Sequence, residues 1–257
     1  MKNSKIICLV VFLALLQGCN NKEKVLQYYS NGKVKAEGTL KNGKKEGVAK
    51  LFYENGNVKE VGNWKDNKQE GEWLFYNENG KLSKSVNFKN DFQEGIMRIY
   101  YENDSLKEYS NWKNGQLMGE SFLYYENGRV EEHFTWQNSK KEGVSMTYYE
   151  NGSLQQLGHW EDNLQSGNFI TFCSNGDTLQ VGKYKSGKKI GYFRSFYENA
   201  NLLSIINYND DIQNGNCKFY FDNGHIEQEG SFSNGKPSGM WHFYKKDGTL
   251  MKTKIFE

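Results

Sequence analysis

The sequence predicts an all-β protein: an elongated antiparallel meander of about ten 24-residue hairpin repeats in a single sheet. Three residue series that share one period predict this fold. Glycine recurs every 24 residues from Gly47 to Gly239, and an aromatic residue does so from Tyr28 to Tyr244. A second aromatic series runs from Trp64 to Phe256. Aromatic residues make up 15% of the chain and there is one proline, which favours short strands joined by turns.

The N-terminal residues predict a signal peptide that precedes the repeats. Lys2 and Lys5 come before an apolar run at 6–16, which is too short to span a bilayer. The segment Leu16-Gln-Gly-Cys19 resembles a bacterial lipobox, and this resemblance implies acylation of Cys19 after cleavage before it. The alternative is an ordinary secretory signal with an incidental cysteine. We therefore expect a signal peptide at 1–18, an acylated tether at 19–27 and a repeat domain at 28–257.

Each repeat carries two turn signals, 11 residues apart. Asn31-Gly32 and Asn42-Gly43 are the first pair. Asn and Gly tolerate the positive φ that both central residues of a type I′ hairpin turn need, so we expect such turns and about twenty strands of roughly 7–9 residues. Asp104 and Ala200 replace the turn glycine, and looser turns or another turn type are expected there.

Alternation along the strands predicts two different faces. One face is aliphatic, small and aromatic, and the recurring glycine is expected to lie opposite a large ring that covers it. Its representatives are Val58, Gly62, Trp64, Gly71, Trp73 and Phe75, joined in most units by the Tyr53 position. The other face is mostly polar, with Lys33, Lys35, Glu37 and Thr39 in the first unit, and the aromatic series from Tyr28 to Tyr244 intrudes there.

The repeat unit resembles the MORN-variant repeat over residues 28–257. The matching motif is Tyr53-Glu-Asn-Gly-Asn-Val-Lys-Glu-Val-Gly-Asn-Trp64, followed by Gly71-Glu-Trp73. Proteins with this repeat are often named YwqK-type antitoxins. The resemblance therefore implies a hairpin array, and it raises toxin neutralisation by binding as one expectation.

Two cysteines remain in the repeat domain, Cys173 and Cys217. We place them in equivalent strands two units apart, or roughly 19 Å at about 4.8 Å per strand. A disulfide needs Cα atoms within about 7 Å. Both thiols are therefore expected to be free.

No constellation of residues in the sequence predicts catalysis, a cofactor or a metal site. The four histidines occupy four different positions of the repeat, whereas a metal needs converging ligands. Glu46, Glu70, Glu94 and Glu142 recur before the glycine series and are interpreted as solvated strand ends. Positive and negative charges are mixed along the chain, so no nucleic-acid partner is expected.

Two surface features are candidates for binding. The Tyr28–Tyr244 ladder could stack on sugars or a peptide, or it could stiffen the sheet. The second candidate is an apolar patch where earlier repeats carry charges, expected to bind a partner or a second copy of the chain unless the twist of the sheet covers it. Its residues are Leu157, Phe172, Leu179, Val181, Phe196, Leu203 and Ile205.

The leading functional hypothesis is a lipid-anchored repeat scaffold of the bacterial cell envelope, facing the periplasm or the cell surface. Cys19 would attach it to the membrane, and an unknown protein or envelope polymer would be its partner. The alternatives are an antitoxin-like or immunity-like protein and, more remotely, a carbohydrate-binding module. An exported, acylated chain disfavours a cytoplasmic antitoxin.

Overall fold

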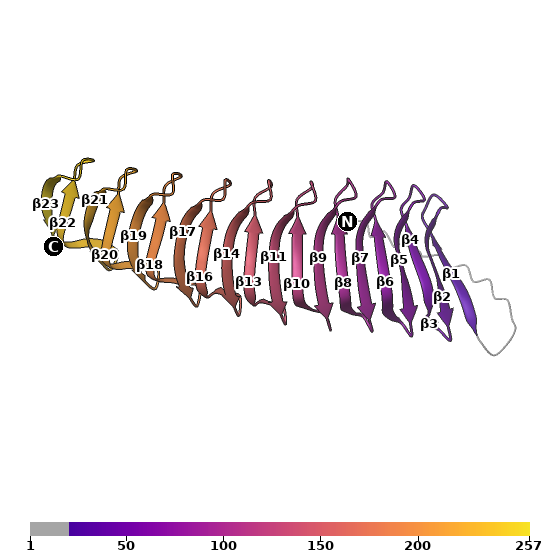
Figure 1. The fold of residues 1–257 in the computed structure, drawn as a ribbon. Coiled ribbons are helices and arrows are strands. Elements are labelled where there is room, and N and C mark those ends of the chain that lie inside the picture. Colours follow the sequence, from indigo (N-terminus) through magenta and orange to yellow (C-terminus); the bar gives the residue numbers. More distant parts are fainter. Residues whose placement is uncertain (1–20) are drawn as a thin grey trace, which may run out of the picture. The chain divides into compact units, whose positions relative to one another are not determined.

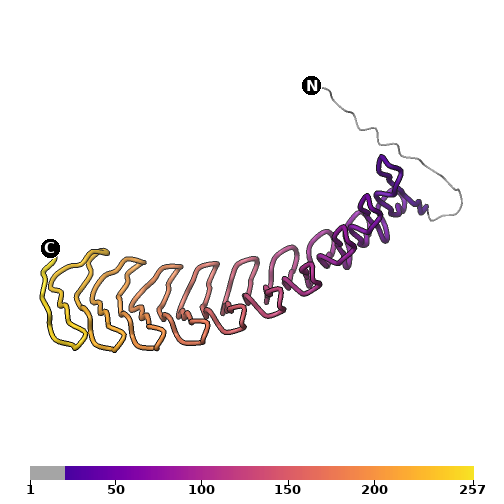
Figure 2. The backbone as a smooth tube through the Cα atoms, turned by 90° about the horizontal axis from the view of Figure 1, so that it is seen from above, coloured from indigo at the N-terminus to yellow at the C-terminus, as the bar shows by residue number. Residues whose placement is uncertain are grey.

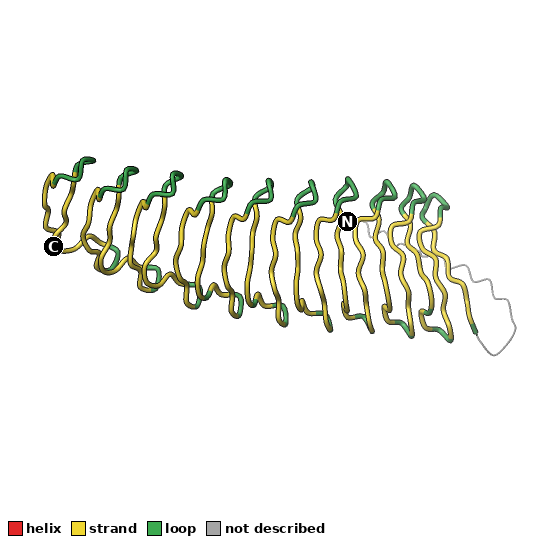
Figure 3. Tube along the Cα trace, viewed as in Figure 1, coloured by secondary structure: helices red, strands yellow, loops and turns green. Residues whose placement is uncertain are grey.

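The computed structural model describes residues 21–257, which contain strands and turns and no helix (Figure 3). The signal peptide, Cys19 and the start of the tether lie outside the described residues. Residues 22–27 of the expected tether belong to the first strand. The chain divides into two compact units, the first ending at Gln116 and the second comprising Leu117–Glu257.

In unit 1 each strand pairs antiparallel with its neighbour in the chain (Figure 1). The strands are β1 (Lys22–Tyr28), β2 (Val34–Lys41), β3 (Lys44–Lys45), β4 (Gly47–Phe52), β5 (Val58–Lys65), β6 (Lys68–Tyr76), β7 (Leu82–Lys89), β8 (Phe92–Tyr100) and β9 (Leu106–Lys113).

Unit 2 repeats this arrangement, and its hairpins follow one another in chain order (Figure 2). Its strands are β10 (Gln116–Tyr124), β11 (Val130–Gln137), β12 (Lys140–Lys141), β13 (Gly143–Tyr148), β14 (Leu154–Glu161), β15 (Leu164–Gln165), β16 (Gly167–Phe172), β17 (Thr178–Lys185), β18 (Lys188–Phe196), β19 (Leu202–Asn209), β20 (Ile212–Tyr220), β21 (Ile226–Ser233), β22 (Lys236–Tyr244) and β23 (Leu250–Phe256). β3, β12 and β15 are two-residue pieces, each one residue before the next strand. The expected all-β meander of about twenty strands is therefore confirmed.

The two turns of each repeat differ, and only one of them is of the expected type. At the turn between β2 and β3, which we call the lower turn of the repeat, Asn42 and Gly43 both have positive φ, 51° and 77°, as a type I′ turn requires. At the turn between β4 and β5, which we call the upper turn of the repeat, the Gly56 amide donates to the Tyr53 carbonyl. Among the residues of this turn only Gly56 has positive φ. This is a three-residue hairpin loop that ends in a left-handed residue. The prediction of type I′ was wrong there because Asn-Gly occurs in both loop types.

The expectation of different turns at Asp104 and Ala200 was also wrong. Their φ angles are 67° and 63°, and their amides donate to the carbonyls of Tyr101 and Tyr197 as Gly56 does to Tyr53. The neighbouring hydrogen bonds hold these residues in the left-handed region, at a cost that glycine avoids.

The recurring glycines pair with the second aromatic series as predicted, for example Gly71 with Phe88 and Gly47 with Trp64. Glycine is required at these positions for a different reason from the expected one. The φ angles of this series lie between +68° and +93°, and a Cβ added at Gly71 would meet no atom within 4 Å. Backbone conformation at a bulge, rather than a covering ring, therefore requires these glycines.

The core is a line of side chains on the sheet face that carries Trp64 and Trp73, which we call the ring face. Position 73 and its equivalents pack on position 62 and its equivalents in the preceding strand. A Cβ built on Gly62 would lie 2.0 Å from the Trp73 ring, and one on Gly182 would lie 2.2 Å from the Phe193 ring. Apart from glycines, the buried residues of the described chain are Trp73, Ser85, Val86, Met97, Ser110, Phe134, Ser145, Phe169, Phe193, Ser204, Cys217 and Trp241. Most of them belong to this line.

Candidate functional site

Aromatic side chains flank the core line and pack edge to face. Trp64 meets Trp73 with ring centroids 5.2 Å apart, and Tyr184 meets Phe193 at 5.5 Å. Such pairs contribute about 0.5–1.5 kcal/mol each beyond the area that they bury. The predicted ring face is therefore the packed side of the sheet.

Lysine ammonium groups lie over these rings. Lys141 Nζ is 3.4 Å from the centroid of Phe134, and Lys45 Nζ is 4.0 Å from that of Trp64. Burial lowers the pKa of Lys141, while Glu132 acts in the opposite direction. Attraction to the ring faces favours the charged form.

A cavity of about 340 Å³ opens on the ring face at the N-terminal end of unit 1. Gly38 and Ala49 belong to its lining, and their equivalents Gly62 and Trp73 form a filled pair one repeat further on. Trp64, Trp73 and Lys45 also line it, together with Val25 of β1. We call this cavity the slot. Gly38 and Ala49 at core positions are the sequence signal for the slot, which was not among the predicted sites.

On the opposite, polar face of unit 2, strand pairing joins an apolar row. Leu157 is the register partner of Ile170, and Ile170 is the partner of Val181. Arg194 is the register partner of Val181 on one side and of Ile205 on the other. Two predicted patch residues, Leu157 and Val181, thus lie on either side of Ile170, which the prediction missed. The 24-residue period alone did not reveal the row because it places residues by equivalence rather than by cross-strand neighbour.

The remaining predicted patch residues lie nearer the upper turns. Phe172 pairs with Thr178 and Phe196 with Leu202, each at a register shift. Leu179 is 43% exposed, whereas the other predicted residues are half-buried. Tyr192, 49% exposed, lies with Arg194 between two shallow hollows. We define the unit-2 patch as Leu157, Ile170, Val181, Tyr192, Arg194 and Ile205.

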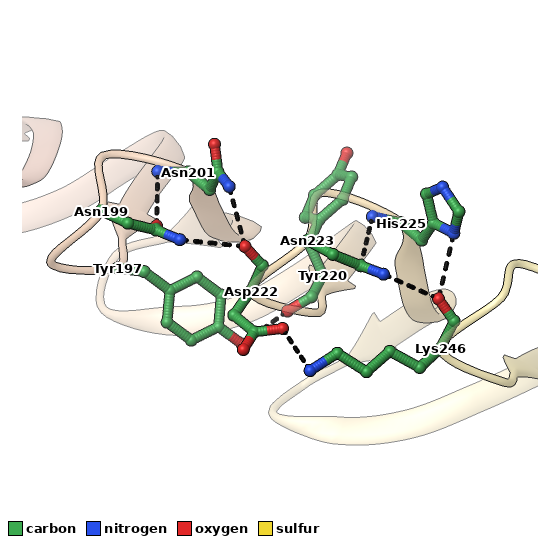
Figure 4. A network of polar contacts seen from close by, with 8 residues as sticks. All are labelled: Tyr197, Asn199, Asn201, Tyr220, Asp222, Asn223, His225 and Lys246. Carbon is green, nitrogen blue, oxygen red and sulfur yellow. Dashed lines mark hydrogen bonds and ion pairs between the residues drawn. The ribbon is translucent and has the colours of Figure 1, made fainter.

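The recurring geometry of the upper turns comes from side chains that reach the next turn (Figure 4). The Tyr197 hydroxyl donates to the Tyr220 carbonyl at 2.7 Å, and Asn199 Nδ2 donates to the Asp222 carbonyl at 3.0 Å. Asn199 Oδ1 meanwhile accepts the Asn201 amide within its own turn. These bonds explain the Tyr-x-Asn-Gly motif as a structural device, because each turn holds the following one.

The recurring glutamates also make structural contacts, because they accept hydrogen bonds from backbone amides of the next lower turn. Glu46 Oε2 accepts the backbone amide of Asp66 at 3.1 Å, and Glu142 Oε2 accepts that of Asp162. They therefore connect consecutive lower turns rather than only ending strands in solvent. The described residues contain no group of His, Cys, Asp and Glu side chains that could hold a metal ion.

The tyrosine ladder is mostly half-buried, apart from Tyr28 in the first strand, which is 53% exposed. Some of its hydroxyls have intramolecular partners, as Tyr244 has in Glu229 at 2.8 Å. The hydrogen bond from Lys218 lowers the pKa of Glu229 most, and the one from Tyr244 lowers it further. These contacts support the interpretation that the aromatic ladder stiffens the sheet.

Both cysteines are free, as predicted, but not for the reason given. Cys173 is the first turn residue after β16, whereas Cys217 lies in the core line in β20. They are not at equivalent positions, and three strands separate β16 from β20. Burial raises the pKa of the Cys217 thiol to about 11.

No helix long and apolar enough to cross a membrane occurs between residues 21 and 257.

Comparison with known families gives two matches. The family model described as MORN repeat variant matches six segments that together cover half of the chain: 24–42, 45–66, 69–90, 93–114, 141–162 and 213–234. The model described as MORN repeat matches 61–72 and 229–248. No curated protein matches the chain.

Solved structures with some similarity include the TCP10 domain of Danio rerio CPAP in complex with a peptide of Danio rerio STIL, at 11% identity and a TM-score of 0.32, covering 91% of this chain and 95% of that one. A TcdB2–TccC3–Cdc42 complex is 14% identical with a TM-score of 0.21, and the match covers 90% of this chain and 15% of the other. A Tc holotoxin pore of Photorhabdus luminescens is 11% identical with the same TM-score, covering 86% and 13%. At these TM-scores the similarities support no functional argument.

Proposed function

Since the chain belongs to the MORN repeat variant family, we propose that it is a repeat scaffold of the cell envelope, anchored by a lipid on Cys19, that binds a protein partner through the unit-2 patch. The observation that carries the binding proposal is the row Leu157, Ile170, Val181, Arg194 and Ile205 on the polar face, with exposed Tyr192 beside it.

The composition of the unit-2 patch supports a protein partner. Interface energy is concentrated in a few residues, and tyrosine and arginine are enriched among them. Here Tyr192 and Arg194 lie between aliphatic side chains that can exclude water. The first repeat places Glu37 and Lys50 at the positions of Val181 and Arg194, so the unit-2 patch differs from its equivalent in that repeat, whereas the next repeat has Val61 and Leu74 there. A toxin that binds here would make the protein antitoxin-like.

The binding proposal can be tested by quantitative pull-down from envelope extracts. The double variant Tyr192→Ala and Arg194→Ala should lose at least tenfold of the partner captured by the wild type, since hot-spot truncations cost about 2 kcal/mol or more. A matched control, Leu164→Ala and Ile212→Ala, changes two comparably exposed residues of unit 2 near lower turns. Equal losses in both variants, or none in either, would contradict the proposal.

The anchor is tested separately by Cys19→Ser. Cell fractionation should move the variant out of the membrane fraction, and intact mass should lack the lipid found on the wild type. Retention of the variant in the membrane, with the wild-type mass unmodified, would contradict the lipid anchor and leave the patch proposal standing.

A further inference from the structure

The floor of the slot is built from small residues of the core line. Val25, Gly38 and Ala49 occupy successive core positions, and the first large core side chain after them is Trp73. A Cβ on Gly38 would be 3.4 Å from the Ala49 Cβ, whereas one on Gly62 would be 2.0 Å from the Trp73 ring. A methyl group therefore covers the backbone where a ring covers it one repeat later. The volume of the slot falls in the range of about 300–1,000 Å³ that is usual for ligand sites.

The indole N–H of Trp64, in the wall of the slot, lacks the acceptor that equivalent tryptophans have. Trp160 Nε1 donates to the Ser145 hydroxyl at 2.7 Å, and a second tryptophan of the series makes the same bond at 2.6 Å. Ala49 occupies the place of this serine in the repeat of Trp64, so the bond cannot form there. An acceptor atom of a ligand above Ala49 would take the place of the missing hydroxyl.

Two opposite charges lie toward the two ends of the slot. Lys45 is the register partner of Leu40, and its ammonium lies over an indole ring. Glu60 is the partner of Leu51. Leu51 in turn is the partner of Ala36, which precedes Leu40 by four residues of β2, or about 13 Å. No ion pair joins Lys45 and Glu60, and neither has another ion-pair partner among residues 21–257.

Glu60 is a half-buried carboxylate at the upper end of the slot. Burial raises its pKa, and Lys59 acts in the opposite direction to a smaller extent. Removing a carboxylate from water costs free energy unless an opposite charge or a hydrogen-bond donor replaces the water. An ammonium group of a ligand would supply both to Glu60.

Between the two charges the slot is lined by apolar side chains. These are Val25, Ala36, Leu40, Ala49, Leu51 and Trp73. Glu37, Thr39 and Lys50 also border the cavity, but they alternate with the apolar residues and belong to the opposite face. Because an unpaired polar group is costly to bury, a hydrocarbon segment fits this stretch better than an amide or a hydroxyl group.

We propose that the slot binds an ω-amino carboxylic acid, a small molecule with a carboxylate at one end, an ammonium at the other and a hydrocarbon chain between them. The carboxylate accepts hydrogen bonds from the Lys45 ammonium and from the Trp64 indole N–H. The ligand ammonium pairs with Glu60, and the chain lies over Gly38 and Ala49. This site is independent of the unit-2 patch.

The probe is 6-aminohexanoate, titrated into the full chain while the indole NMR signal of Trp64 is followed. Hexanoate lacks the ammonium and hexylamine lacks the carboxylate. Each should bind at least about tenfold more weakly, because one charged hydrogen-bonding group is lost. Equal affinity for hexylamine would overturn the proposal in favour of a simple cation site, and equal affinity for hexanoate in favour of an anion site. No shift at millimolar 6-aminohexanoate would overturn it outright.

Variants at the two ends of the slot assign the ends of the ligand. Glu60→Gln should weaken 6-aminohexanoate binding at least about tenfold and leave hexanoate binding unchanged, since hexanoate has no ammonium to lose. Lys45→Met should do the same to 6-aminohexanoate and leave hexylamine binding unchanged. Glu72→Gln is the matched control, because Glu72 is exposed on the opposite face. Equal weakening of 6-aminohexanoate and hexanoate by Glu60→Gln would overturn the pairing of Glu60 with the ammonium.

Filling the slot from within tests its location. Ala49→Phe places a ring where Trp73 stands one repeat later and should weaken 6-aminohexanoate binding at least about tenfold. Val48→Phe adds the same ring on the opposite face, where Val48 is 58% exposed, and should leave the affinity unchanged. Should Ala49→Phe unfold, the smaller and more flexible Ala49→Met takes its place.

Equal affinity of the wild type and the filled variant would overturn the slot as the binding site. The variant Tyr192→Ala and Arg194→Ala should bind 6-aminohexanoate like the wild type. Failure at the slot is therefore distinguishable from failure at the unit-2 patch.

Discussion

Glycine serves two distinct purposes in this chain at the scale of single residues. The series that includes Gly71 adopts a left-handed backbone at a bulge, and Gly62 and Gly182 instead make room for a ring. An alanine would fail at these two kinds of site for different reasons, a strained φ in the first and a steric clash in the second.

Gly182→Ala should therefore destabilise the protein by roughly 1–3 kcal/mol, because its Cβ would fall 2.2 Å from a Phe193 ring carbon. Gly38→Ala is the matched control at the equivalent position and should cost much less, since its Cβ would meet only the Ala49 Cβ at 3.4 Å. Denaturant unfolding of both variants measures the difference. Similar losses would show that ring packing does not explain Gly182.

Cys217 gives a pH dependence whose sign follows from its burial. Its pKa rises from 9.0 to about 11 on folding, so the unfolded chain releases the proton first as pH rises. Folding stability is unaffected by this group below about pH 9 and falls between about pH 9 and 11, by roughly 3 kcal/mol in total. Unfolding measured at pH 8 and 10.5 should show a steeper loss for the wild type than for Cys217→Ala.

Thiol alkylation provides an independent check on Cys217. Cys173, in a turn and half-buried, should react with iodoacetamide well before Cys217, which is 2% exposed. Equal alkylation rates in the native protein would contradict the buried position of Cys217.

At the scale of the elements, the hairpins are linked by side chains that bond the next turn as well as by their strand ladders. Asn199 shows why asparagine suits this place, because its carbonyl oxygen serves its own turn and its amide nitrogen serves the next. Aspartate would lose the donor, and serine would not supply both groups with the same reach.

Tyr197→Phe should reduce stability by about 1 kcal/mol, since it removes the hydroxyl that donates to the Tyr220 carbonyl and leaves that carbonyl without this donor. Tyr28→Phe removes a hydroxyl from a ring that is 53% exposed and should change stability by less than half as much. Thermal unfolding of the two variants compares them. A larger loss in Tyr28→Phe would contradict the turn-linking role.

At the scale of the whole molecule, contacts are local in sequence. Core side chains touch mainly the hairpins next to them, so each repeat depends on its neighbours rather than on a central core. Stability should consequently vary along the array and respond locally to mutation.

Phe193→Ala removes a ring that is 3% exposed and packs against Tyr184 and Tyr208. We expect a loss of about 3 kcal/mol and faster amide exchange in β17–β20. Exchange in β4–β7 should stay unchanged. Hydrogen-exchange mass spectrometry resolves both regions, and a uniform increase along the chain would contradict local coupling.

The sequence by itself determined the period, the antiparallel strands, the type I′ lower turns and the two faces. These features depend on local φ preferences and on alternation, and both repeat every 24 residues. Only the tertiary structure decided the upper loop type, the reason for each glycine, the slot and the row through Ile170 and Arg194. Those features depend on which side chains meet across neighbouring strands. Gly38 and Gly62 show the difference, because they occupy the same place in the repeat and only one lies beneath a ring.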